Sequence, residues 1–247
     1  MYNFFVTPDK REQNRFFISG SDFNHIKNVL RMAEGEEFFV SCEGLSHLCR
    51  ISGFMGESVV AEIIEENCNN TELPIKIHLF QGLPKSDKME LIIQKAVELG
   101  VCKVVPCEMS RCVVKLEEKK KKSKKERWQA ISESAAKQSK RNTVPEIMDV
   151  MSFKQALEFS KKLDILLVPY ENARGMAATK EALSKIKSGM SVGIFIGPEG
   201  GFDESEIKLA ESTGALTVSL GERILRTETA AITAVGMCML YAEMNLE

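Results

Sequence analysis

The 247-residue sequence has few of the residues on which several protein classes depend. It contains one tryptophan, three tyrosines and three histidines. Its seven cysteines form no Cys-x-x-Cys pair, and those at 102, 107 and 112 are too widely spaced for an ordinary zinc knuckle. We therefore expect reduced thiols, no disulfide framework and no metal.

Long apolar runs are also missing. The longest apolar helix candidate, residues 230–242, is interrupted by Thr233 and is shorter than the roughly 20 residues that a bilayer-spanning helix needs. The N-terminal residues do not resemble a secretory signal. We therefore expect a cytoplasmic protein without a membrane segment.

Three familiar catalytic motifs are absent. No Gly-Lys-Ser/Thr closes a phosphate-binding loop, no Gly-x-Gly-x-x-Gly fingerprint occurs, and no Gly-x-Ser-x-Gly elbow is present. His25, His47 and His78 all lie far in sequence from the glycine-rich segments near the C-terminus. The sequence thus argues against a P-loop nucleotidase, a dinucleotide-binding enzyme and a hydrolytic triad.

Charge is present but unevenly spread. The net charge is only −2, yet residues 111–141 hold twelve Lys and Arg against four Asp and Glu, whereas residues 1–70 hold six against eleven. The local positive excess indicates a polyanionic partner. A solvated, lysine-rich linker and helix face is an alternative that the charge pattern leaves open.

Residues 1–70 have the pattern of a small β-barrel. Short β-rich runs at 4–6, 16–18, 38–40 and 59–64 are separated by glycines. A helix over 23–31 interrupts them, capped by Ser21 or Asp22, with a buried stripe at Phe23, Ile26, Val29 and Leu30. The polar segment 65–72 is the expected linker.

Residues 73–247 alternate between strand and helix patterns, which predicts parallel βαβ units. A helix is expected to start at a capping Asp87, with Glu90 three residues on, and to end at Gly100. Strands are expected at 75–81, 101–105, 165–168, 194–196 and 217–220. Further helices are expected near 123–140, 152–162, 177–187, 203–213 and 229–244.

The last of these helices is apolar or small on nearly every face. Small residues at 230, 231, 234 and 236 would permit close approach, while four larger ones need cover from the core or a second subunit. We expect a homodimer interface to supply that cover for Ile232, Val235, Met239 and Leu240.

Two glycine-containing segments carry the strongest functional signal. Residues 197–203 read Gly-Pro-Glu-Gly-Gly-Phe-Asp and follow an apolar strand, and residues 220–230 follow a weaker strand. If those strands are neighbours, both loops lie in the crevice where open α/β sheets bind ligands. Backbone amides, apolar walls and ionisable side chains there would suit an adenosine-like ligand beside a polar reactant. A purely structural turn is the alternative.

These two segments resemble the paired signature of the ribosomal small-subunit RNA uridine-N3 methyltransferases, members of the SPOUT class. Further matching segments at 25–31, 94–101, 127–128, 135–141 and 169–171 extend the resemblance over nearly the whole chain. It implies an α/β parallel-sheet methyltransferase domain with a trefoil knot, preceded by a PUA-like β-barrel that binds RNA. Asn3 and Met109 depart from the usual family pattern.

The resemblance also implies the chemistry. The methyl donor would be S-adenosylmethionine, and the target would be N3 of one uridine in the decoding region of 16S ribosomal RNA or the small subunit, with a homodimer as the active form. Glu199 and Glu228 are candidate bases for the N3 proton, and Arg226 is a candidate for stabilising charge on the uracil oxygens. Glu228 could instead stabilise a helix dipole, and Arg226 could form a structural ion pair.

Ligand contacts follow by position from the same resemblance. The cofactor would contact three loops, at Val168 and Pro169; Ile196, Gly197, Pro198, Glu199 and Gly200; and Leu220, Gly221, Ile224 and Leu225. RNA would contact His25, Arg31, Arg111, Arg127, Gln138 and Arg141, although His25 and Arg31 could instead be ordinary surface residues of their helix.

Two other functions remain open from the sequence. One is a non-enzymatic RNA-binding factor of the same fold. The other is a methyltransferase of this fold that acts on another RNA or on the ribose.

Overall fold

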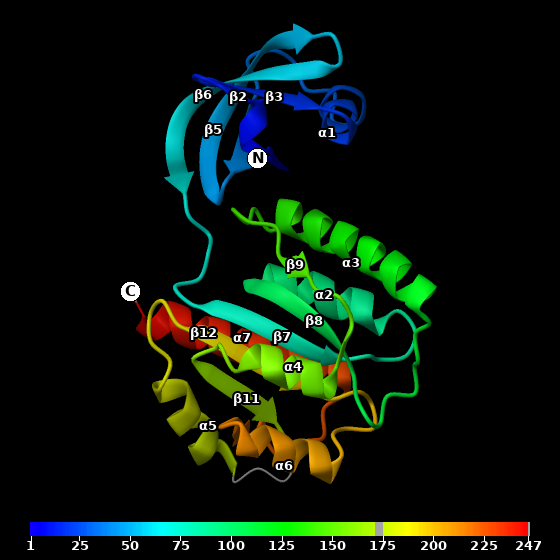
Figure 1. Cartoon of the computed structure of the whole chain (residues 1–247). Coiled ribbons are helices and arrows are strands. Elements are labelled where there is room, and N and C mark those ends of the chain that lie inside the picture. The colour runs from blue at the N-terminus through cyan, green and yellow to red at the C-terminus, as the bar shows by residue number, and fades with distance from the viewer. Residues whose placement is uncertain (171–174, 247) are drawn as a thin grey trace. The chain divides into compact units, whose positions relative to one another are not determined.

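The structure is a computed structural model that describes residues 1–170 and 175–246 (Figure 1). Glu171, part of the matching segment at 169–171, lies outside the described residues. The chain forms two compact units. Unit 1 comprises Met1–Glu72 and Ala136–Val144, and unit 2 comprises Leu73–Ala135 and Pro145–Glu247. The segment 136–144 thus packs with unit 1, although it follows the expected linker by more than sixty residues.

Unit 1 is built on a six-stranded sheet in the order β1-β4-β5-β6-β3-β2. Its pairs are antiparallel except for the parallel pair of β1 and β4. Phe4, Phe16 and Phe38 are fully buried on one side of this sheet. The strands are β1 (Asn3–Phe5), β2 (Arg11–Glu12), β3 (Arg15–Ser19), β4 (Glu37–Cys42), β5 (Leu45–Met55) and β6 (Ser58–Asn69), with a 3-10 turn at Pro8–Lys10.

Strand β5 was not among the expected runs. Its sequence interleaves serine, histidine, arginine and glycine with apolar residues, which hides the strand pattern. The structure nevertheless buries Cys49 and Ile51 in the unit 1 core, and β5 pairs with β4 on one side and β6 on the other. The pairing of β5 with β6 contains register shifts, which bend the sheet.

The helix of unit 1 differs from expectation. Helix α1 (Ser21–Asn24) begins after Gly20 without a side-chain cap and continues as a π-helical turn at His25–Val29. The amide of Leu30 donates to the carbonyl of His25, five residues back. This wider turn rotates the following side chains, so Ile26 is fully buried whereas Val29 is 64% exposed. The expectation that Val29 belongs to the buried stripe was wrong.

Arg141 holds segment 136–144 in unit 1 through an ion pair and hydrogen bonds. The Arg141 side chain is 3% exposed, and its Nε donates to Glu72 Oε1 at 2.9 Å. The amide of Asn142 donates to the same oxygen, also at 2.9 Å. The carbonyl of Arg141 accepts a hydrogen bond of 3.0 Å from Asn3 Nδ2. The assignment of Arg141 to RNA binding is therefore corrected, because a buried guanidinium bonded to a carboxylate is not available to a phosphate.

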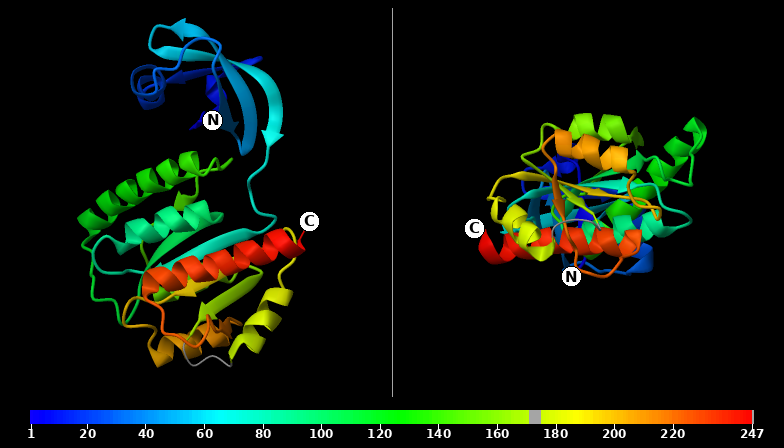
Figure 2. Two further views of the ribbon diagram at one scale, coloured as in Figure 1. Left: turned by 180° about the vertical axis from the view of Figure 1, so that it is seen from behind. Right: turned by 90° about the horizontal axis from the view of Figure 1, so that it is seen from below.

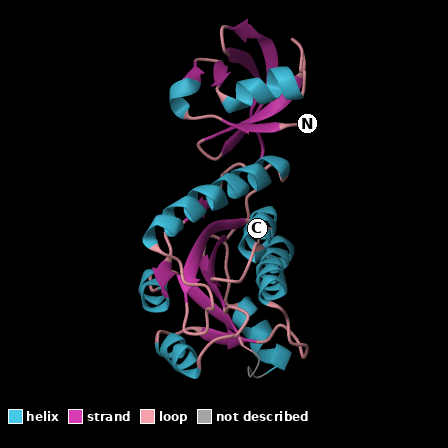
Figure 3. Ribbon diagram, turned by 90° about the vertical axis from the view of Figure 1, so that its right-hand side faces the viewer, coloured by secondary structure: helices cyan, strands magenta, loops and turns pink. Residues whose placement is uncertain are grey.

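Unit 2 contains a parallel sheet in the order β10-β8-β7-β12-β11-β13, and β9 pairs with β8. The central strands β7 and β12 are buried almost throughout, which explains why β12 shows no polar alternation. In Figure 3 these magenta strands lie between cyan helices. The strands are β7 (Lys76–Gly82), β8 (Val101–Glu108), β9 (Glu146–Ile147), β10 (Met151–Ser152), β11 (Ile165–Pro169), β12 (Ser191–Ile196) and β13 (Leu216–Val218).

Strands β12 and β13 are not neighbours, which corrects the expectation behind the two glycine segments. Strand β11 lies between them and pairs with both. All three strands are parallel, so their carboxyl ends still meet at one edge of the sheet. The consequence is a site built from three loops.

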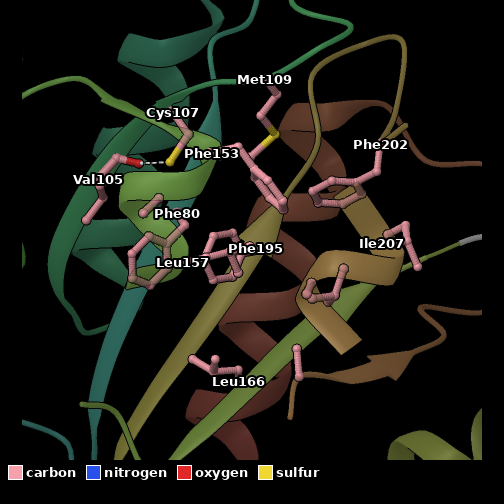
Figure 4. Packing of buried hydrophobic residues seen from close by; sticks show 14 residues of the cluster. Phe80, Val105, Cys107, Met109, Phe153, Leu157, Leu166, Phe195, Phe202 and Ile207 are labelled. Carbon is pink, nitrogen blue, oxygen red and sulfur yellow. Dashed lines mark hydrogen bonds between the residues drawn. The ribbon is translucent and has the colours of Figure 1, made fainter. Parts of the chain in front are cut away.

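Helices cover both faces of the unit 2 sheet. Helices α4 and α6 lie on one face, and α7 packs with α2 on the other (Figure 2). Under α4 and α6, Phe80 stacks on Phe195 with ring centroids 4.2 Å apart, and Phe153 meets Phe195 edge-on (Figure 4). The helices are α2 (Lys88–Glu98), α3 (Glu118–Gln138), α4 (Phe153–Ser160), α5 (Gly175–Ser184), α6 (Glu204–Ser212) and α7 (Thr227–Asn245).

The observed helix ends agree only in part with the ends expected from the sequence. Helix α6 starts in a capping box formed by Asp203 and Glu206. Asp87 precedes α2 but makes no side-chain cap hydrogen bond, so the cap expected there was wrong. Gly100 follows α2 with φ +93°, and a Cβ at this position would lie 2.5 Å from Leu73. In the described part of the chain, no helix combines the length and apolar character that crossing a membrane requires.

Candidate functional site

A pocket of about 530 Å³ lies at the carboxyl ends of β11, β12 and β13. Three loops that follow these strands form most of its wall, and the first turn of α7 closes one side. Two cations complete the wall, one from the start of α2 and one from the segment after β8. The lining residues are Lys88, Arg111, Pro169, Tyr170, Ile196, Gly197, Pro198, Glu199, Gly200, Gly201, Phe202, Ser219, Leu220, Gly221, Arg223, Ile224, Leu225, Arg226, Thr227 and Ala230.

The loop after β12 requires glycine because backbone segments approach closely. A Cβ on Gly197 would lie 3.1 Å from the carbonyl carbon of Gly201, and a Cβ on Gly200 would lie 3.0 Å from Cβ of Arg111. Across the sheet, a Cβ on Gly82 would lie 2.7 Å from the backbone nitrogen of Pro198. These close approaches bring the peptide backbone to the pocket wall with no side chain in between.

A buried hydrogen-bond relay joins this loop to helix α7. Gln81 Nε2 donates to Thr227 Oγ1 at 3.0 Å, and Thr227 Oγ1 donates to the carbonyl of Gly197 at 2.7 Å. Both side chains are buried. Sequence reasoning assigned neither residue to the site, although a glutamine inside an apolar strand was a usable signal.

Three charged side chains at the pocket form one cluster: Lys88, Glu199 and Glu228. Glu199 Oε1 accepts a hydrogen bond of 3.0 Å from the amide of Lys85, and Lys88 Nζ lies 3.1 Å from the same oxygen. Lys88 Nζ also lies 3.3 Å from Glu228 Oε2. Burial alone would raise the pKa of Glu199, but the hydrogen bonds from backbone amides and the Lys88 ammonium outweigh it, so this pKa lies below its ordinary value. Glu199 is therefore ionised at neutral pH.

The predicted cofactor residues come together at this pocket with one exception. Every residue of that set lines the pocket except Val168, whose side chain is 1% exposed and belongs to the hydrophobic core. The side chain of Val168 is therefore not exposed to the pocket, and the expected contact of this position with the cofactor stays a prediction. Of the three predicted catalytic residues, Glu199 and Arg226 line the pocket, whereas Glu228 lies outside its lining and pairs with Lys88.

The predicted RNA contacts are distributed over both units. Arg111 lines the pocket, where its Nη1 donates to the carbonyl of Gly200 at 3.2 Å. His25 and Arg31 are exposed on unit 1. Arg127 is exposed on α3 and pairs with Glu90 at 2.8 Å, and Gln138 is exposed at the end of the same helix.

Sequence reasoning missed Lys88, Arg223 and Tyr170 as pocket residues. Lys88 is the first residue of α2, where the helix dipole disfavours a cation. That unfavourable position was a signal that partners of opposite charge lie nearby.

Two family descriptions match the chain. The RNA methyltransferase domain family matches residues 71–239, and the RNA methyltransferase PUA domain family matches residues 18–64. The ribosomal RNA small subunit methyltransferase E of Bacillus subtilis is 39% identical over 99% of this chain and 98% of its own length. The chain belongs to the ribosomal RNA small subunit methyltransferase E family. The relative of the same name from Mesomycoplasma hyopneumoniae is 36% identical over 97% of this chain and 99% of its own length.

Solved structures of this family agree. The Neisseria gonorrhoeae methyltransferase E, solved bound to S-adenosyl methionine, has a TM-score of 0.80 and 30% identity, and the match covers 97% of each chain. A Legionella pneumophila protein solved with the cofactor SAM has a TM-score of 0.82 and 30% identity, over 97% of each chain. The expected family is confirmed, as are a PUA domain and a parallel α/β methyltransferase domain of the SPOUT class, whereas the trefoil knot stays a prediction.

Proposed function

We propose that the protein is an S-adenosylmethionine-dependent methyltransferase that methylates N3 of a uridine in the decoding region of 16S ribosomal RNA. The observation that carries this proposal is the three-loop pocket at the carboxyl edge of the unit 2 sheet, in a chain of the methyltransferase E family. A family member solved with S-adenosyl methionine supports the choice of methyl donor.

The pocket fits this donor in size and character. Its volume of about 530 Å³ lies within the range of small-molecule sites. Ile196, Leu220 and Leu225 offer apolar walls for an adenine ring, and the glycine-rich backbone at 197–201 permits close approach. Bound there, S-adenosylmethionine would supply a methyl group on a sulfonium, so the protein's task is to hold the uracil in line with it.

The reaction removes the proton from uridine N3, and a side chain of the pocket would accept it. We assign Glu199 as the base, because it lines the pocket and is ionised at neutral pH. Arg226 lines the same pocket and would stabilise negative charge that develops on the uracil carbonyl oxygens. Glu228 is the less suitable base, because it lies outside the pocket lining and pairs with Lys88.

RNA binding would combine unit 1 with the basic helix α3. Helix α3 carries six lysines between residues 119 and 125, which favours salt-dependent attraction to phosphates without reading of base sequence. On unit 1, His25 and Arg31 are exposed contacts for RNA, and Arg127 and Gln138 are exposed contacts on α3. Arg111 would position the target nucleotide, because it reaches the pocket itself.

The active form would be a homodimer. Helix α7 buries Val235 within its own chain, so only part of its apolar surface needs further cover. Leu240 is 50% exposed and Met244 is 73% exposed, and Leu91 of the adjacent helix α2 is 43% exposed. A second copy of this chain would cover these side chains.

Two measurements test the proposed function. Titration calorimetry with S-adenosylmethionine should give saturable binding, which a pure RNA-binding factor has no reason to show. The purified protein should then restore a primer-extension stop in small-subunit RNA from a bacterial strain that lacks this modification, because N3 methylation blocks base pairing. Free 16S RNA and assembled subunits are offered in parallel to identify the substrate. Absence of cofactor binding, or a stop at a different nucleotide, would refute the proposal.

Glu199→Gln tests the assignment of the base. The amide keeps the shape of the side chain but does not accept a proton at neutral pH, so turnover should fall about a hundredfold or more. Cofactor affinity should fall far less than turnover, because the glutamine keeps the shape of the pocket wall and removes only the proton acceptor. Glu98→Gln on α2 is the matched control, since Glu98 pairs with Lys95 and does not line the pocket. Unchanged turnover in the Glu199 variant would remove Glu199 from this role.

A further inference from the structure

Lys88 occupies an unusual position in the structure. It is the first residue of α2, where the positive end of the helix dipole disfavours an ammonium group. Its side chain is only 28% exposed, and it reaches two carboxylates that come from different elements. Glu199 follows β12 and Glu228 stands in the first turn of α7. One nitrogen therefore links three separate elements at the pocket wall.

The two carboxylates depend on that nitrogen to different degrees. Glu199 has a second partner, the amide of Lys85. Glu228 Oε2 is buried and has no hydrogen-bond partner in the described part of the chain, so the ammonium 3.3 Å away is its electrostatic partner. Without Lys88, two acidic groups would face each other beside the pocket with no cation between them. Like charges in this arrangement favour protonation of one carboxylate.

We propose that Lys88 is a positioning residue for methyl transfer, which acts by bridging the Glu199 and Glu228 carboxylates and holding them in place at the pocket wall. This inference rests on the proposed function and extends it to a residue outside the glycine loops. Lys88 fixes the loop after β12 against the first turns of α2 and α7. Its charge also contributes, after the hydrogen bonds from backbone amides, to lowering the pKa of Glu199.

Three other charged side chains line the same pocket and could affect the titration of Glu199: Arg111, Arg223 and Arg226. They do not bridge Glu199 and Glu228, because among the described residues no ion pair of theirs involves either carboxylate.

Lys88→Met is the test variant, since it keeps most of the side-chain length and removes the charge. The matched control is Lys95→Met on the same helix, which breaks the Lys95–Glu98 pair away from the pocket. Methyl transfer to small subunits is measured under single-turnover conditions from pH 5 to pH 8. Lys88→Met should lower the rate at pH 7 by about tenfold or more. Cofactor affinity from calorimetry should stay within about threefold of wild type, and Lys88→Arg should recover much of the rate.

The ratio of variant rate to wild-type rate separates positioning from a general structural defect. If Lys88 lowers the pKa of Glu199 in the working enzyme, the ratio should rise with pH, because higher pH restores the Glu199 charge that the variant loses. A merely structural role would give a ratio that does not change with pH. A pH-independent ratio, or a Lys88→Met rate equal to that of Lys95→Met, would overturn the proposal.

Carboxyl titrations followed by ¹³C NMR test the same inference without substrate. In Lys88→Met, the Glu199 carboxyl should titrate at a higher pH than in wild type, because one of the groups that lower its pKa is removed. Identical titrations would overturn the inference even if the methylation target were a different RNA. If wild type transfers no methyl group while the titrations shift as expected, the proposed function fails and the electrostatic role of Lys88 stands. Lys88→Gln serves in these experiments if Lys88→Met does not fold.

Discussion

Replacement of Arg141 by methionine should destabilise unit 1 without directly removing an RNA contact. Methionine fills much of the space of the arginine stem but leaves Glu72 without its guanidinium partner. Glu72 would keep the hydrogen bonds from the amides of Asn142 and Thr143, at 2.9 and 3.2 Å. The Glu72 carboxylate, which ends the first part of unit 1 and is bonded to the second, would then lack the positive charge that balances it.

The expected size follows from the burial of the pair. Removal of one partner from a buried ion pair costs about 3–5 kcal/mol. The Arg141 side chain is 3% exposed, but Glu72 is 25% exposed and retains two amide donors. We therefore expect a loss near the lower end, about 3 kcal/mol, which corresponds to about a hundredfold in the unfolding equilibrium.

The pH dependence has a definite sign. Burial would raise the pKa of Glu72, but the hydrogen bonds and charge of Arg141 outweigh this effect and hold the pKa below its ordinary value of 4.5. A carboxylate with a lowered folded pKa stabilises the fold above its unfolded pKa, and this contribution is lost as the pH falls through the folded pKa. The difference between wild type and Arg141→Met should therefore be full at pH 7 and should shrink below about pH 4.5.

Hydrogen exchange of the unit 1 strands in a urea series would measure this loss separately from unit 2. Arg50→Met is the matched control, because it breaks an Arg–Glu pair at 2.7 Å in the same unit whose side chains are 48% and 34% exposed. Such a surface pair contributes about 0–1 kcal/mol. Equal effects of the two substitutions would refute the reasoning, as would weaker RNA binding by Arg141→Met with unchanged stability.

Three further predictions concern other parts of the chain. Gly82→Ala should weaken S-adenosylmethionine binding by about tenfold or more in calorimetry, since its Cβ would lie 2.7 Å from Pro198, whereas Gly236→Ala should not, because its Cβ would lie 3.8 Å from Leu99. Burial lowers the pKa of His78 to about 4, so the unfolding free energy of unit 2 should fall as the pH drops from about 6.5 towards 4, and His78→Phe should reduce this slope in urea titrations. Leu240→Glu should shift sedimentation towards the monomer if α7 forms the proposed interface, and unchanged sedimentation would contradict that interface.

Much of the fold of unit 2 could be predicted because local patterns and packing agree there. The buried run before residue 197 has no polar alternation and became the central strand β12, and Gly100 ends α2 where a helix stop was expected. Unit 1 was less predictable. Strand β5 has no clear alternation, and the π-helical turn that exposes Val29 leaves no simple periodic signal in the sequence.

The roles of individual residues depend on contacts between residues that are far apart in the sequence. Arg141 falls within a segment that resembles the RNA methyltransferase family, which suggested an RNA contact. Its partner Glu72 is 69 residues away, and only the fold brings the two together. The same applies to Lys88, whose partner Glu199 belongs to a different element. The sequence gives the position of every charged residue in the chain, but it does not show which of them pair with one another in the fold.

The pocket was predicted from an incorrect strand adjacency, and the reason that it was still found is physical. In a parallel sheet every strand ends at the same edge, so loops after β12 and β13 can line one pocket although β11 separates them. The intervening strand adds its own loop, and Pro169 and Tyr170 line the pocket as a result. A third loop encloses a ligand from another side, which two adjacent loops would not do. The intervening position of β11 therefore strengthens the assignment of this edge as the ligand site.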